Sequence, residues 1–101
     1  MRLLAQLSEA KRVPLKFLLA IGVKDCPEGI EIPYRDRDGK LAPRQRVRIG
    51  LTSKDGFKWT GSGAVIPYGE WMKHPDIENM ILVEGESDVW TLWLHKFNAI
   101  G

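Results

Sequence analysis

The spacing of apolar residues changes twice along these 101 residues, and each change limits the folds that the chain can adopt. Leu4 and Leu7 are spaced to share one face of a helix, whereas from Gly29 onward apolar residues occupy every second position. Residues 80–83 are then apolar without interruption. Helices repeat about every 3.6 residues and strands every two, so these patterns specify different elements. The sequence therefore predicts helices first, antiparallel strands next, and a different kind of strand near the end.

Two short helices are predicted near the N-terminus. The helical spacing stops at Val13-Pro14, where the proline restricts the residue before it and can occupy the first turn of a new helix. The second helix is expected from about Pro14 to Ile21, and Gly22 can adopt the left-handed conformation that ends it. Residues 1–28 are therefore expected to form a helical hairpin.

Residues 29–79 carry the pattern of an antiparallel meander. The first turn contains Asp38-Gly39, a dipeptide that favours hairpins. Strands are expected on both sides of that turn and again at residues 57–60, followed by an apolar run at 64–66. Because successive side chains of a strand point to opposite faces, the strand at residues 44–51 separates apolar from basic side chains. Val47, Ile49 and Leu51 fall on one face, and Arg44, Arg46 and Arg48 on the other.

The C-terminal segment predicts a β-α-β unit. A continuous apolar run such as residues 80–83 is typical of a strand that is covered on both faces in a parallel sheet. Ser87 or Asp88 can cap the helix that follows, Asn98 can end it, and Ala99-Ile100 begins a second strand. The expected fold class is therefore α+β. Its parts are an N-terminal helical hairpin at 1–28, an antiparallel meander at 29–79 and a partial β-α unit at 80–101.

Composition limits the class of protein. With 44% hydrophobic and 28% charged residues, the chain has the composition of a folded globular domain. Its one cysteine, Cys26, cannot form an internal disulfide, and with only His74 and His95 besides it cannot build a four-ligand structural zinc site. No stretch reaches the roughly 20 apolar residues that span a bilayer. We therefore expect a cytoplasmic protein without a membrane segment or a structural zinc.

Residues 81–88, with the sequence ILVEGESD, are the strongest candidate for a reactive site. They place Glu84 at the end of a predicted buried strand, and in open α/β sheets ligands bind outside the carboxyl ends of the strands. Gly85 allows a backbone or a phosphate to approach closely. The alternative is structural: Glu84 is then a strand-end carboxylate, and Asp88 is a helix cap that the helix dipole favours.

Basic side chains form a second candidate site, for nucleic acid. The net charge of +2 is too small to indicate nucleic-acid binding, so the positions of the charged residues have to be considered. The arginines of residues 44–51 share one strand face, and a nearby tryptophan followed by a glycine-rich turn suits bases and phosphates. The alternative is an ordinary solvated sheet face. The candidate nucleic-acid-binding residues are Arg35, Arg44, Arg46, Arg48, Lys58 and Trp59.

The chain also carries a family resemblance. The run LVEGESDVWTLW, followed by NAIG, resembles the first motif of the topoisomerase–primase (TOPRIM) fold, which primases, topoisomerases, old-family nucleases and a recombination mediator share. The upstream segments EAKRVPLKFLLAIGV, IPYRDRDGK, RVRIGL and FKWTGSG resemble only the primase side of that group, in particular the primases of phages and mobile elements. Together these segments cover nearly the whole chain.

The resemblance implies a DNA primase, which joins ribonucleotides on a single-stranded DNA template during DNA replication. It assigns catalysis to Glu84, as an acid or base associated with Mg²⁺ or Mn²⁺, with Gly85 and Asp88 in support. In the family a later strand supplies an Asp-x-Asp pair that binds the metal, and no such pair follows Glu84 here. Phosphoryl transfer needs metal ions to neutralise developing charge. We therefore expect the front part of a primase, inactive alone, that binds metal only when the missing carboxylates are supplied.

The expected partners are single-stranded DNA and nucleotides, together with a second polypeptide or a second copy of the chain at the C-terminal β-α unit. That unit is expected to expose a strand edge, and unpaired edges favour association. Two other functions stay open. One is a non-catalytic nucleic-acid-binding or protein-interaction module derived from a primase. The other is a TOPRIM nuclease, against which the primase-like segments at 32–40 and 57–63 argue.

Overall fold

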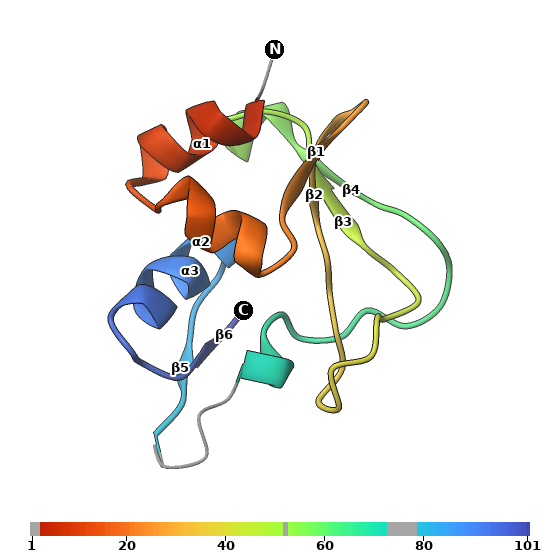
Figure 1. The fold of residues 1–101 in the computed structure, drawn as a ribbon. Helices are drawn as coiled ribbons and strands as arrows, with labels where there is room; N and C mark the ends of the chain where they lie inside the picture. Colours follow the sequence, from red (N-terminus) through yellow and green to blue (C-terminus); the bar gives the residue numbers. More distant parts are fainter. Residues whose placement is uncertain (1–2, 52, 73–78) are drawn as a thin grey trace. The chain divides into compact units, whose positions relative to one another are not determined.

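The computed structural model describes residues 3–51, 53–72 and 79–101, and the fold is α+β (Figure 1). This confirms the fold class expected from the sequence. Among the described residues, no helix is long and apolar enough to cross a membrane. The chain divides into two compact units, which are described separately below.

The first unit comprises residues 1–33 and 43–64. It contains a pair of helices and a four-stranded antiparallel sheet with the strand order β1-β2-β3-β4. The predicted helical hairpin is confirmed, and so are three strands of the predicted meander. In chain order the elements are α1 (Leu3–Lys11), α2 (Leu15–Ala20), β1 (Lys24–Cys26), β2 (Gly29–Ile32), β3 (Arg46–Arg48), the 3₁₀ turn η1 (Ser53–Asp55) and β4 (Phe57–Trp59).

Strand β1 has no counterpart in the sequence prediction. It lies at the edge of the sheet and pairs antiparallel with β2, so that Lys24 lies opposite Glu31. Lys24 and Asp25 are both exposed. An edge strand whose side chains face solvent lacks the alternation of apolar and polar residues by which strands are identified. The pairing with β2 therefore defines this strand, and its own composition does not.

The core of the first unit is aliphatic. Helix α1 packs against β1 and β2, and α2 packs against α1. Asp25 Oδ1 also accepts a hydrogen bond from the Leu4 amide at 2.8 Å, which satisfies one of the amides left unpaired at the start of a helix. The buried apolar side chains of this unit include Leu4, Leu7, Val13, Leu18, Val23, Ile30, Ile32 and Val47.

The second unit joins the turn at residues 34–42 to residues 65–101. Strands β5 and β6 pair in parallel, with Ile81 opposite Ala99, and α3 connects them, which is the β-α-β arrangement that the sequence predicts. On the other edge of β6, Tyr68 and Gly101 exchange two backbone hydrogen bonds of 2.9 and 3.0 Å. The elements are the 3₁₀ turn η2 (Glu70–Met72), β5 (Ile81–Leu82), α3 (Glu86–Leu94) and β6 (Ala99–Ile100).

The described α-helices α1, α2 and α3 all end at a residue in the left-handed conformation. After α2, Gly22 has a φ of 91°, its amide bonds to Leu19, and the Val23 amide bonds to Leu18. These two hydrogen bonds give partners to backbone carbonyls of the last turn of α2, which would otherwise lack them. The expectation that Gly22 ends this helix is confirmed. After α1 and α3 the left-handed residues are Arg12 and Lys96, with φ values of 55° and 64°. The prediction that Asn98 ends the last helix was therefore wrong, because the helix is closed two residues earlier.

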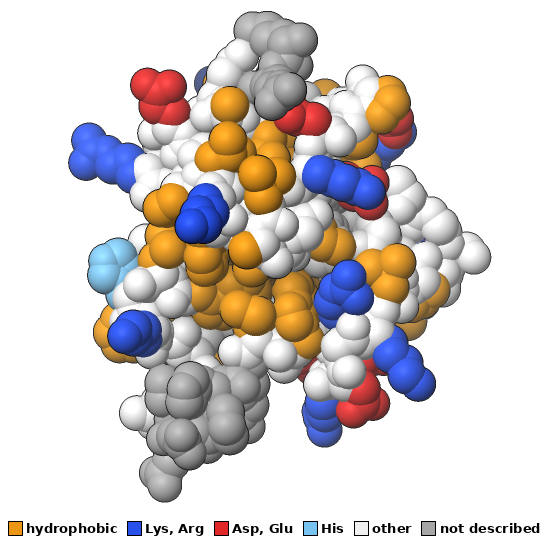
Figure 2. Space-filling model, viewed as in Figure 1, with side chains coloured by type: hydrophobic (Ala, Val, Ile, Leu, Met, Phe, Trp, Pro, Cys, Tyr) orange, Lys and Arg blue, Asp and Glu red, His pale blue; other side chains and the backbone are white. Residues whose placement is uncertain are grey.

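One further expectation for the strands differs from the structure. Strand β5 is not covered on both faces, since both of its residues are exposed and 75% of Leu82 is accessible. The reason is that α3 packs mainly against β6 rather than β5. Hydrophobic side chains also reach the surface among charged ones on the face drawn in Figure 2.

Candidate functional site

Glu84 lies in the turn between β5 and α3, at the carboxyl end of a parallel strand, and its side chain is exposed. Asp88 is also exposed, in the first turn of α3. Neither carboxylate forms a hydrogen bond or an ion pair with another described residue. Residue Gly85 is the N-cap of α3, and no side chain caps the helix. The expectation that Ser87 or Asp88 caps it was therefore wrong.

Gly85 adopts an extended conformation, with φ −139° and ψ 159°. Any residue can adopt these angles, so the backbone does not require glycine here. A Cβ atom added to Gly85 would meet no atom within 4 Å. Gly85 therefore leaves open space at the start of α3, directly after Glu84.

Glu86, two residues after Glu84, differs from it in burial and in hydrogen bonding. Its side chain is buried, with 3% accessible, and its Oε2 accepts a hydrogen bond of 2.7 Å from the hydroxyl of Tyr34. Because Glu86 lies in the first turn of α3, the helix dipole also favours its negative charge. Sequence reasoning did not single out Glu86, since Tyr34 precedes it by 52 residues and no local pattern connects them.

A second buried hydrogen bond lies beside the first. The Trp90 indole Nε1 donates to the hydroxyl of Tyr68 at 2.8 Å, and the Tyr34 and Tyr68 rings are 4.9 Å apart. Burial raises the pKa of Tyr68 far above its usual value near 10, although the hydrogen bond from Trp90 lowers it. The nearby Glu86 and Tyr34 raise this pKa further. Tyr68 is therefore neutral and is held in one orientation.

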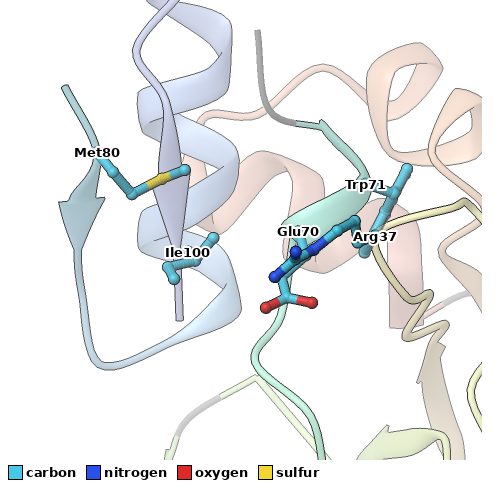
Figure 3. Close-up of a pocket in the computed structure, with 5 residues that line it drawn as sticks. All are labelled: Arg37, Glu70, Trp71, Met80 and Ile100. Carbon is cyan, nitrogen blue, oxygen red and sulfur yellow. The ribbon is translucent and has the colours of Figure 1, made fainter. Parts of the chain in front are cut away.

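A pocket of about 420 Å³ lies in the second unit, and neither Glu84 nor Asp88 is among its lining residues. Figure 3 shows Met80 and Ile100 on one side of it and Trp71 on the other. The guanidinium of Arg37 is directed toward the side where Ile100 lies (Figure 3). The sequence prediction did not bring these five residues together in one place.

The arginines of the first unit stack on aromatic rings of β4. In the sheet Arg46 pairs with Trp59, and Arg48 with Phe57, so these side chains share one face. The Arg46 guanidinium carbon lies 4.1 Å from the Phe57 ring centroid and 5.3 Å from that of Trp59. Arg44 lies 5.9 Å from Trp59. We call Arg44, Arg46, Phe57 and Trp59 the arginine–aromatic face.

The other predicted nucleic-acid-binding residues are placed differently. Arg48 is buried, and its guanidinium donates hydrogen bonds of 2.9 and 2.7 Å to the Gly50 and Leu51 carbonyls. Lys58 lies opposite Val47, on the other face of the sheet, and forms an exposed ion pair of 2.8 Å with Glu28. Arg35 belongs to the second unit, where its Nη1 donates to the carbonyl of Gly39 at 3.0 Å. The structure therefore brings together Arg44, Arg46 and Trp59 of the predicted set.

Comparisons with protein-family models, with curated proteins and with solved structures gave no match for this chain. The case for a function therefore depends on the residues described above. In the part of the chain that the structure describes, no three or more His, Cys, Asp or Glu side chains form a group that could hold a metal ion.

Proposed function

We propose that this chain carries the template-binding and acid–base parts of a TOPRIM-type DNA primase, with Glu84 at the reaction centre. The observation that supports this best is the position of Glu84, an exposed carboxylate at the carboxyl end of β5 without a hydrogen bond or ion pair to the described residues. Ligands of α/β sheets bind at this end of a strand. The structural alternative has Asp88 as the cap of α3, and no side chain caps this helix in the described chain.

In this proposal Glu84 accepts the proton of the hydroxyl that attacks the α-phosphate of a nucleoside triphosphate, and pyrophosphate leaves as the new phosphodiester bond forms. The carboxylates of Glu84 and Asp88 are oxygen ligands of the kind that Mg²⁺ prefers, and substrate phosphates complete such sites. The metal would neutralise charge on the phosphate as it is transferred. The open space at Gly85 suits a phosphate beside the start of α3.

The arginine–aromatic face is proposed to hold the single-stranded template. Arginine neutralises phosphates, and planar rings stack on unpaired bases without regard to sequence. Arg44 and Trp59 are both partly accessible, as are Arg46 and Phe57.

Fluorescence anisotropy with a labelled single-stranded oligonucleotide tests this assignment. Arg46→Gln is expected to weaken binding and to reduce the dependence of log K on log salt by about 0.7 for each phosphate that the protein no longer neutralises. Lys58→Gln is the matched control, because it removes one positive charge from the opposite face of the same sheet. Equal effects of the two variants would indicate binding by net charge alone, and the assignment to this face would then be wrong.

Primer synthesis tests the role of Glu84. The isolated chain is expected to make no primer with Mg²⁺ or Mn²⁺, because no Asp-x-Asp pair, to which the resemblance assigns the metal, follows Glu84 in these residues. Adding a polypeptide that supplies an Asp-x-Asp pair is expected to restore synthesis to the wild-type chain and not to Glu84→Gln. Metal-dependent synthesis by the chain alone, or synthesis by the Glu84→Gln variant after such addition, would contradict the proposal.

The exposed strand β5 favours a second candidate function, a module that associates through its sheet. The Ile81 amide donates to the Asn98 carbonyl at 2.9 Å, and the Val83 amide donates to the Ile100 carbonyl at 3.0 Å. Among the described residues, no strand pairs with the other edge of β5. Leu82 is largely accessible there. Unpaired edges of this kind are templates for another strand. Sedimentation over a concentration series checks this candidate, and a chain that stays monomeric at high concentration would exclude self-association.

A further inference from the structure

The pocket of the second unit is lined by side chains from four separate segments of the chain. Arg37 comes from the turn at residues 34–42, Glu70 and Trp71 from η2, Met80 from the residue before β5, and Ile100 from β6 (Figure 3). Its volume of about 420 Å³ is in the range of small-molecule pockets. A guanidinium, a carboxylate, an indole ring and two aliphatic or thioether side chains therefore line one space.

The opposite charges of Arg37 and Glu70 limit the kind of ligand that fits this space. A ligand with an anionic group alone is attracted by Arg37 and repelled by Glu70, and for a cationic group alone the two effects are exchanged. A wholly apolar ligand displaces water from both charges and gives neither a partner, which costs free energy. A small molecule with one group of each sign gives both side chains a partner. The charges therefore favour a zwitterion.

The backbone that carries Arg37 is held by a tight turn. Asp36 Oδ1 accepts hydrogen bonds from the amides of Asp38 and Lys40, at 2.9 and 3.0 Å. The Asp36 amide donates to the Lys40 carbonyl at 2.8 Å, and the Gly39 amide donates to the Asp36 carbonyl at 2.9 Å. An aspartate that bonds to its own turn in this way stabilises the turn. Arg37 is thus presented from a fixed backbone with an exposed side chain.

The Trp71 ring is also held in place. It makes edge-on contacts with Tyr68 and Trp93, at centroid distances of 5.4 and 5.7 Å. Both of these neighbours are buried, and Tyr68 is itself fixed by the hydrogen bond from Trp90. Edge-to-face contacts favour one orientation of a ring over others. An apolar group that packs on Trp71 therefore meets a preformed surface.

We propose that this pocket binds a free α-amino acid with a hydrophobic side chain. The Arg37 guanidinium is suited to the carboxylate, to which it can donate two parallel hydrogen bonds, and Glu70 is suited to the ammonium group. Trp71, Met80 and Ile100 form an apolar wall suited to the side chain. An α-amino acid carries these three groups on one carbon atom, so all of them reach the lining of one small pocket. The choice of ligand depends on the lining residues and not on the proposed function.

Isothermal titration calorimetry with L-phenylalanine as the probe tests this inference on the intact chain at neutral pH. Two matched compounds each lack one charge: L-phenylalaninamide has no carboxylate, and N-acetyl-L-phenylalanine has no ammonium group. The wild-type chain is expected to bind L-phenylalanine about tenfold more tightly than either compound, as for the loss of one hydrogen bond to a charged group. Because the two compounds resemble the first and last residues of a peptide, they also distinguish a free amino acid from a peptide end.

Variants assign each charge of the ligand to one residue. Arg37→Gln is expected to weaken binding of L-phenylalanine about tenfold and to remove its advantage over the amide. Glu70→Gln is expected to weaken binding about as much and to remove the advantage over the N-acetyl compound. Lys40→Gln and Asp38→Asn are the matched controls, because they remove one charge of each sign from the turn at residues 34–42 without changing a residue that lines the pocket. Neither control should change the affinity.

No saturable binding of L-phenylalanine by the wild-type chain, or equal binding of either matched compound, would overturn the inference without any variant. It would also be overturned by a preference over the amide that survives Arg37→Gln, or by one over the N-acetyl compound that survives Glu70→Gln. Circular dichroism in the near ultraviolet checks that the tryptophan environment of each variant is native. If a variant does not fold, the comparison of the three compounds on the wild-type chain still decides.

Discussion

The two units of this chain are stabilised in different ways. The first buries aliphatic side chains from two helices and a meander, and its aromatic residues Phe57 and Trp59 are only half buried beside arginines. The second buries two tyrosines, two tryptophans and the carboxylate of Glu86, and connects them by hydrogen bonds. Aliphatic packing is non-directional, whereas a buried polar network holds each member in one orientation.

This difference has a functional consequence. The polar network lies in the same unit as Glu84 and the pocket, and its members hold Trp71 and the first turn of α3. Orientation matters most where a ligand has to be positioned. In the first unit the half-buried aromatic rings lie at the surface, which suits a partner such as a flexible single strand. The following variants test this difference between the units, in order of decreasing expected loss of stability.

Gly29→Ala is expected to have the largest effect on stability. A Cβ at this position would lie 2.1 Å from the Arg48 carbonyl oxygen, and the φ of 153° is one that side chains rarely adopt. The loss of unfolding free energy is expected to reach about 3 kcal/mol or more, through disruption of the β2–β3 pairing. Urea unfolding measures it. Gly85→Ala is the control, with an expected change in unfolding free energy under about 0.5 kcal/mol. Comparable losses for Gly29→Ala and Gly85→Ala would show that the close contact at Gly29 does not determine the cost.

Ile32→Ala probes the aliphatic core of the first unit. Ile32 is completely buried, so the substitution removes apolar packing and leaves a cavity that costs about 2 to 5 kcal/mol. Ile49→Ala, at a partly exposed position of the same sheet region, should cost much less. Urea unfolding of the two variants checks the difference. Similar losses would show that Ile32 is not a core residue.

Tyr34→Phe probes the polar network of the second unit. It removes the hydroxyl that donates to Glu86 and is expected to cost about 1.5 to 3 kcal/mol, the usual cost for a hydrogen bond to a charged group. Amide exchange in α3 is expected to accelerate. In the double variant Tyr34→Phe with Glu86→Leu, the loss is expected to differ from the sum of the two single losses, because the two side chains interact directly. Losses that add within about 0.5 kcal/mol would argue against this hydrogen bond.

Tyr68 gives the second unit a sensitivity to alkaline pH. Because burial raises the pKa of Tyr68, the unfolded chain loses this proton near pH 10 while the folded chain keeps it. Stability is therefore complete below about pH 10 and falls above it, by up to about 1.4 kcal/mol per pH unit. In Tyr68→Phe this part of the pH dependence should be absent. Urea unfolding between pH 8 and about pH 11 compares the slopes, and parallel slopes would contradict the assignment.

Glu84→Gln is expected to have the smallest effect, within about 0.5 kcal/mol, because the side chain is exposed and makes no hydrogen bond or ion pair to a described residue. Glu86→Gln, two residues further on, changes a buried acceptor and should cost more. Thermal unfolding of the pair measures the contrast. If Glu84→Gln proved the more destabilising, Glu84 would be a structural residue and the proposed function would lose its main support.

Much of the local structure follows from patterns within short stretches of sequence. Helical spacing and Pro14 predict the first two helices, and Gly22 predicts the end of α2. The alternation of arginine and apolar residues predicts that Arg46 and Arg48 share a face, as the pairing with Trp59 and Phe57 requires. These predictions succeed because helix and strand periods act over a few residues.

Other features have no local pattern from which they could be predicted. Arg12 and Lys96 end helices without glycine, and β1 is a strand only through its partner β2. Arg48 is separated from Arg44 by only four residues, yet its guanidinium bonds to two backbone carbonyls of the loop that follows β3. Alternation along a strand predicts the face of a side chain, but not whether the neighbouring loop covers it.

For the candidate sites, sequence patterns predict that an acidic residue, Glu84, follows an apolar strand and precedes a helix, and that arginines alternate along another strand. They do not predict that Glu84 is exposed while Glu86 is buried against Tyr34, or that Arg37, Glu70 and Trp71 line one pocket with Ile100. The two kinds of feature depend on interactions of different range. Backbone periodicity depends on neighbours in the chain, whereas burial and hydrogen bonding depend on residues that folding brings together from distant positions.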